Sequence, residues 1–170
     1  MQAAVVSKPE PLVRELFRNP ALVTCACANV LICYSGRTPV KSYLEGSLQA
    51  IHLYAKDYPQ GLGMMVLIAE DEPPPDDEGR RAIIATREAL KHCVQGSVLV
   101  VEGEGFAASA KRSVVAMFSL ASSRPFPEKV AGNIQEGAAK LAKLLGPRVD
   151  PSLDAALIAA AATSVRKTFP

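Results

Sequence analysis

The run Met-Met-Val-Leu-Ile-Ala at positions 64–69 decides the fold that this sequence predicts. Six consecutive apolar residues are typical of a strand buried on both faces, as in parallel sheets that helices cover on each side. A second run, Ser-Val-Leu-Val-Val at positions 97–101, has the same character. The segment 77–94 between them carries Asp and Glu in its first turn, which favours a helix N-terminus. Strand, helix and strand in succession predict a layered α/β domain with parallel strands.

Two further elements are predicted between this region and the N-terminus. Positions 21–35 are rich in Val, Ile and Cys and are broken near Asn29, which favours two strands, 22–28 and 30–34, joined by a tight turn. One long strand is the alternative. From Thr38 apolar residues recur at spacings of three and four, which predicts an amphipathic helix with Thr38 as N-cap and Pro39 at its first position.

The flanking segments complete the predicted order. Residues 1–8 are expected to be a flexible end and 10–18 a short helix. Positions 106–120 predict a third helix, 128–131 a short strand, 134–145 a fourth helix, and 150–167 a last helix that Asp150 caps. We therefore expect one α/β domain at 21–146, with a flexible end and short helix at 1–20 and a C-terminal helix at 147–170 packed on it.

Composition limits the class of protein. The 170 residues are 49% hydrophobic and 21% charged, which excludes a wholly disordered chain. The basic residues are scattered and have no aromatic residues between them, which argues against nucleic-acid binding. The longest weakly polar stretch, positions 21–34, is shorter than the roughly 20 residues of a membrane helix. With no secretory signal pattern at the N-terminus, a cytoplasmic location with reduced cysteines is the expectation.

The order of elements, the two apolar runs and the segment GFAASAKRSVV at 105–115 resemble the STAS domain, the family named for sulfate transporters and anti-sigma-factor antagonists. The resemblance covers roughly 21–145. It implies a β-hairpin followed by alternating helices and parallel strands, and a regulatory function through protein contacts. Antagonist-type members carry a phosphorylatable Ser or Thr at the start of the helix after the third strand. Positions 70–79 here contain neither residue, so we expect an interaction module without a phosphorylation switch.

The expected contact surface combines an acidic loop with the turn after the second apolar run. Six acidic residues lie within positions 70–78, and they offset an otherwise basic chain. A protein partner with a basic surface, or a second copy of the chain, would be oriented by this charge. The predicted partner-binding residues are Asp71, Glu72, Asp76, Asp77, Glu102, Glu104 and Phe106.

The alternative prediction is a ligand site at the carboxyl ends of the strands. Ligands of open α/β sheets favour the loops that follow those ends. Glu70, Asp71, Glu102 and Glu104 lie there, and their carboxylates are suited to Mg²⁺ or Ca²⁺. The competing interpretation of the acidic loop is a solvated connection in which Asp77 caps the following helix.

No catalytic or cofactor motif is found. Cys25 and Cys27 are two apart and so share one face of a strand, and Cys33 on the partner strand is expected near them. Three thiolates without a fourth ligand or a CxxC spacing are better explained as core residues than as a zinc site. His92 and Cys93 are adjacent in a helix and diverge. With no P-loop and no GxSxG motif, we expect a protein that is not an enzyme and needs no cofactor.

Overall fold

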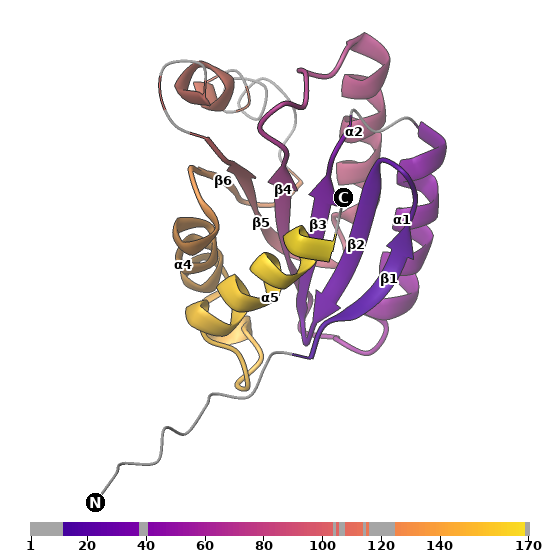
Figure 1. Cartoon of the computed structure of the whole chain (residues 1–170). Helices are drawn as coiled ribbons and strands as arrows, with labels where there is room; N and C mark the ends of the chain where they lie inside the picture. Colours follow the sequence, from indigo (N-terminus) through magenta and orange to yellow (C-terminus); the bar gives the residue numbers. More distant parts are fainter. Residues whose placement is uncertain are drawn as a thin grey trace, which may run out of the picture.

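The computed structural model describes residues 12–37, 41–103, 105, 108–113, 115 and 125–168. Its centre is one six-stranded mixed sheet in which the strands lie in sequence order (Figure 1). The first three strands pair antiparallel and the last four pair parallel. The strands are β1 (Arg14–Arg18), β2 (Leu22–Cys27), β3 (Val30–Ser35), β4 (Leu62–Ile68), β5 (Val94–Val101) and β6 (Glu128–Ala131). The predicted α/β class is confirmed.

Helices cover both faces of the sheet (Figure 1). On one face lie α1 (Lys41–Ala55) and α2 (Asp77–Leu90), and on the other lie α4 (Ile134–Leu145) and α5 (Ala155–Thr168), joined through a short 3₁₀ turn, η1 (Gly146–Arg148). Residues 108–113 are also helical. In the part of the chain that the structure describes, no helix is both long and apolar enough to cross a bilayer.

Strand β4 shows why its run of apolar residues decides the fold. Because successive side chains of a strand point to opposite faces, Met64 faces α1 and α2 while Met65 and Leu67 join the core under α4 and α5. Strand β5 divides in the same way, with Val98 and Val100 in the α4/α5 core. A strand that must be apolar on both faces becomes a continuous apolar run, as predicted.

The hairpin prediction is also confirmed. Ala28 and Asn29 form a two-residue turn between β2 and β3, with Ala28 at φ +45°. The Asn29 side chain is buried and donates to the carbonyl oxygens of Gly61 (3.2 Å) and Arg148 (2.6 Å), while its Oδ1 accepts from the Asp150 N–H (2.9 Å). This one amide therefore ties the hairpin to the segments before β4 and α5.

Four predicted details are wrong. Residues 14–18 are the edge strand β1, not a helix, because pairing with β2 and the seat of Phe17 against Gly46 of α1 override local helical spacing. The α2 cap is Asp76 and not Asp77, since the Asp76 side chain accepts from the Gly79 N–H at 2.8 Å.

The other two concern element ends. Helix α2 ends at Leu90 and β5 begins at Val94, so positions 91–94 are not helical as predicted. The last helix begins at Ala155, because Asp154 accepts from the Leu157 N–H whereas Asp150 accepts from Ser152 within a turn. The predicted flexible end at 1–8, the Thr38-Pro39 cap and most of the predicted third helix lie outside the described residues.

Candidate functional site

Two cavities border the edge of the sheet at which the parallel strands end, and their linings differ in chemistry. The first is an open polar cleft of about 680 Å³ beyond the ends of β4, β5 and β6. The second is an apolar cavity of about 440 Å³ between the sheet and the helices α1 and α2. Ligands of open α/β sheets usually bind at such an edge, so each of the two is a candidate. The polar cleft is lined by Glu70, Glu102, Arg112, Gly132, Glu136 and Arg166, among others.

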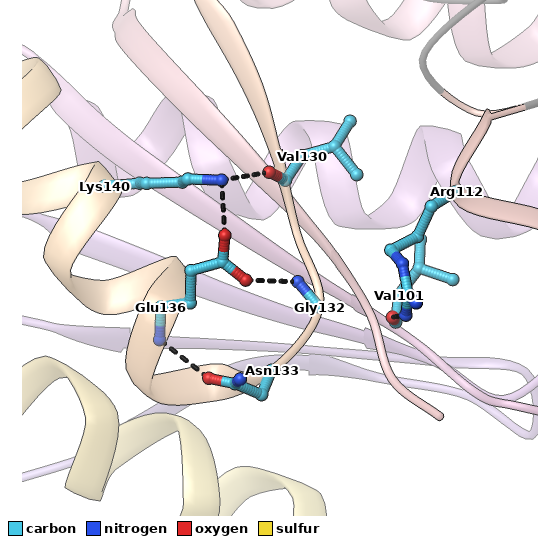
Figure 2. A network of polar contacts seen from close by, with 7 residues as sticks. All are labelled: Val101, Arg112, Val130, Gly132, Asn133, Glu136 and Lys140. Atoms are coloured by element: carbon cyan, nitrogen blue, oxygen red, sulfur yellow. Dashed lines mark hydrogen bonds and ion pairs between the residues drawn. The ribbon is translucent and has the colours of Figure 1, made fainter. Parts of the chain in front are cut away.

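The start of α4 forms one wall of the polar cleft, and its polar groups bond to one another (Figure 2). The Asn133 side chain accepts from the Glu136 N–H at 2.8 Å. The Glu136 carboxylate accepts from the Gly132 N–H at 2.7 Å and from Lys140 Nζ at 2.6 Å. The bond from Lys140, followed by that from Gly132, lowers the pKa of Glu136. This arrangement caps the helix and stabilises the turn before it.

Two further charged side chains of the cleft, Arg112 and Glu102, are also engaged within the chain. Arg112 donates to the backbone oxygens of Gly103 (3.0 Å) and Val101 (3.3 Å), the second of which Figure 2 shows. The Glu102 carboxylate pairs with Arg166 of α5. Arg112 and Glu102 thus tie the helical residues 108–113 and α5 to the end of β5, while Glu136 and Lys140 tie α4 to the end of β6. The cleft therefore has the character of a structural junction.

The apolar cavity arises because α2 is held off the sheet over most of its length. Helix α2 packs against α1, and His52 of α1 contacts the Ala89 oxygen at 3.1 Å. Leu90 at the end of α2 enters the core, whereas Ile83 and Thr86 are only partly buried and face the cavity. The other apolar lining residues include Leu44 and Ile51 of α1, Met64 and Val66 of β4, and Leu99 of β5.

A buried ion pair closes the cavity wall near the start of β6. Arg87 of α2 lies 3.2 Å from the Glu128 carboxylate, and Ser97 of β5 donates to the same carboxylate at 3.0 Å. Both charged side chains are almost fully buried. Since a buried charge requires a partner of opposite charge, this pair fixes the separation between α2 and the sheet edge.

Glu72 places a carboxyl group in the opposite part of the wall. Its side chain is 9% exposed, and its Oε1 accepts from Ser35 Oγ at 3.1 Å. The second oxygen, Oε2, is buried and has no hydrogen-bond partner among the residues that the structure describes. Burial raises the pKa of Glu72 to about 7, an effect that the Ser35 hydrogen bond and the charge of Lys111 partly offset.

Lys111 lines the same part of the cavity from the helical residues 108–113. Its ammonium donates to the backbone oxygens of Ala69 (2.7 Å) and Glu70 (3.2 Å), so the lysine holds this helical segment to the end of β4. Burial lowers the pKa of Lys111. The cavity thus combines apolar walls with a lysine that donates to two backbone oxygens and a carboxyl oxygen, Glu72 Oε2, that lacks a partner within the described ranges.

The residues predicted for the contact surface are separated by the structure. Asp71, Asp76 and Asp77 are exposed, with Asp76 serving as the α2 cap, whereas Glu72 is buried in the cavity wall. Glu102 lines the polar cleft; Glu104 and Phe106 lie outside the described residues.

Only some of the carboxylates that were predicted to bind a metal ion lie close together. Glu70 and Glu102 line the same cleft, but over the described ranges no group of three or more His, Cys, Asp or Glu side chains is placed to hold a metal ion.

The cysteines lie on two faces of the sheet rather than one. Cys25 and Cys27 face α4 and α5, while Cys33 pairs across the strands with Thr24 and so faces α1 and α2. Cys33 therefore lies on the strand next to Cys25, close enough for the two thiols to influence each other, but on the opposite face of the sheet. Burial raises the pKa of Cys25 to about 11 and that of Cys33 to about 12, so both remain neutral thiols in the core.

The sequence analysis missed Ser35 and Lys111 as site residues and assigned Glu72 to the surface. A signal for Ser35 exists, since it follows Cys33 by two positions in β3 and must share its face. No comparable signal shows that the chain turns inward at Glu72, because Glu72 follows two other acidic residues, Glu70 and Asp71, and nothing in the sequence distinguishes it from them.

The chain was also compared with known proteins. A scan against protein-family models found no match, and a search of curated proteins found none either.

Proposed function

We propose that this protein is a non-enzymatic binding domain that holds a small, mainly apolar molecule in the cavity beneath α1 and α2. The observation that carries the proposal is the cavity of about 440 Å³ with mostly apolar walls. Binding sites for small molecules commonly have volumes of about 300–1,000 Å³, apolar linings and a few polar groups that orient the ligand. Glu72, Ser35 and Lys111 are such groups here.

The polar cleft is a weaker candidate for the same function. Arg112, Glu102 and Glu136 all bond to other parts of the chain, so a ligand would compete with contacts that hold the fold together. In the apolar cavity a ligand would cover the apolar lining, and among the described residues it would compete with no hydrogen bond of Glu72 Oε2. Burying apolar surface favours binding by roughly 25 cal/mol per Å² before the costs of association.

A titration with N-phenyl-1-naphthylamine, a neutral apolar dye whose fluorescence rises when it leaves water, tests the proposal. We expect saturable binding of one dye molecule per chain. Val66→Phe places an aromatic ring in the cavity and should weaken dye binding at least about tenfold. The matched control is Leu53→Phe on the outer side of α1, where the leucine is 67% exposed; it should bind as the wild type does. No saturable binding, or equal binding by Val66→Phe, would contradict the proposal.

Our second candidate is the interaction module that the STAS resemblance implies. One observation favours it: Asp71 is exposed on the loop that carries Glu72 into the cavity wall, and Asp77, also exposed, begins α2 directly after this loop. An acidic surface therefore adjoins the cavity. A partner with a basic surface should then be captured from native lysate by the wild type and lost when Asp71 and Asp77 are both changed to Lys. Asp57→Lys, a charge reversal at an exposed site after α1, is the control.

A further inference from the structure

The chemistry around Glu72 narrows the class of ligand, provided that the cavity binds a small molecule as proposed above. A buried carboxyl oxygen without a hydrogen-bond partner is unfavourable, because the group loses its hydration and gains nothing in return. Ser35 satisfies only Oε1, at 3.1 Å. Oε2 has no partner among the described residues, although the side chain lies in the wall of a cavity large enough for a ligand.

We propose that the ligand is an apolar amine, whose protonated amino group donates to Glu72 Oε2 while its hydrocarbon part fills the cavity between α2 and the sheet. The ammonium group supplies both the missing donor and a compensating charge. Hydrogen bonds between two charged groups are roughly twice as strong as those between neutral ones. The hydrocarbon part would contact Met64 and Val66 of β4 and Ile83 of α2.

The neighbouring groups disfavour a negatively charged ligand. A carboxylate would be repelled by Glu72, and Lys111 is poorly placed to receive it because its ammonium already donates to two backbone oxygens. Arg87 is likewise paired with Glu128. A neutral alcohol can donate one hydrogen bond to Oε2 but leaves the buried charge without compensation. The expected order of affinity is therefore amine, alcohol, carboxylate.

Proton binding by Glu72 makes this order depend on pH. Its carboxyl titrates near pH 7, and the charged groups that act on it are Lys111, which favours ionisation, and Asp71, which opposes it. Cys33 also lines the cavity, and burial raises the pKa of its thiol to about 12, so it stays neutral over the range used here. An alkylamine keeps its proton up to about pH 10. Amine binding should therefore tighten as the pH rises from 5.5 to 8.5 and Glu72 loses its proton.

Calorimetric titrations with three eight-carbon probes, octylamine, 1-octanol and octanoate, test the inference. At pH 8.5 we expect octylamine to bind at least about tenfold more tightly than 1-octanol, and octanoate to bind more weakly than either. Octylamine affinity should fall at least about tenfold between pH 8.5 and 5.5, while 1-octanol affinity stays within about twofold. These wild-type series require no variant, so they decide the matter even if a variant fails to fold.

Two variants localise the effect. Glu72→Gln removes the charge with little change of shape and should abolish the preference for octylamine and its pH dependence. Glu70→Gln removes a neighbouring charge that lines the polar cleft, and it should keep both. Octylamine binding no tighter than 1-octanol binding would overturn this inference and leave the proposed function standing. Failure of both probes to bind would overturn the proposed function itself.

Discussion

Among the described elements, α1 and α2 cover one face of the sheet and α4 and α5 the other, yet the two faces are packed in different ways. Under α4 and α5 the helices lie directly on the strands, because small residues allow a close approach. A Cβ atom on Gly137, for example, would lie 2.6 Å from Val100 Cγ2. Under α1 and α2 the sheet meets α2 mainly at its last turn, and a cavity remains. One face supplies stability, and the other has room for a ligand.

The largest expected contrast comes from shortening a leucine on each face. Leu141 of α4 is fully buried in the dense core, so Leu141→Ala should lower the free energy of unfolding by about 3–4 kcal/mol. Leu44 of α1 is only partly buried and already borders the cavity, so Leu44→Ala should cost about 1 kcal/mol. Urea denaturation of both variants measures the difference. Equal losses would show that the two faces are packed alike.

Replacing a valine by a larger side chain on each face tests the same difference in packing from the opposite direction. Val98→Phe inserts a ring into the α4/α5 core, where overpacking should cost about 2–3 kcal/mol. Val66→Phe directs the same ring into the cavity and should change the unfolding free energy by less than about 1 kcal/mol. Denaturant midpoints with unchanged slopes report these values. If Val66→Phe proves as destabilising as Val98→Phe, the space beneath α2 is not available to a side chain.

The buried carboxyl on the cavity face should give this protein an unusual pH dependence. The pKa of Glu72 is raised from about 4.5 to about 7, so between these values the folded state binds more protons than the unfolded state. The stabilisation is complete below pH 4.5 and is lost as the pH rises through 7. We expect Glu72→Gln to be about 3 kcal/mol more stable relative to wild type at pH 8 than at pH 4.5. A difference between the two proteins that does not vary with pH would contradict this assignment.

The smallest contrast concerns the start of α2. Asp76→Ala removes the hydrogen bond to the Gly79 N–H and should cost about 1 kcal/mol. Asp77→Ala removes an exposed first-turn charge next to the cap and should cost no more than about 0.3 kcal/mol. Thermal unfolding in low salt separates the two. A larger loss for Asp77→Ala would show that the helix is capped one residue later than the structure has it.

The sequence was sufficient where burial is imposed by the sheet and insufficient where packing depends on distant contacts. The apolar runs of β4 and β5 were recognisable because both faces of a central parallel strand must be apolar. Strand β1 was not recognisable, since its structure depends on pairing with β2 and on Phe17 meeting Gly46 of α1. The site was missed for a similar reason: the cavity depends on how far α2 stands from the sheet, which no local pattern determines.

Two adjacent methionines offer the most direct test that the α1/α2 cavity is a binding site. Met64 lines the cavity, and Met65 lies in the α4/α5 core on the other face of the same strand. Methyl NMR of protein labelled with ¹³C at the methionine methyl groups, titrated with N-phenyl-1-naphthylamine, follows both faces at once. We predict a saturable shift of the Met64 methyl signal with that of Met65 nearly unchanged. A saturated dye complex in which Met64 does not shift would contradict the account.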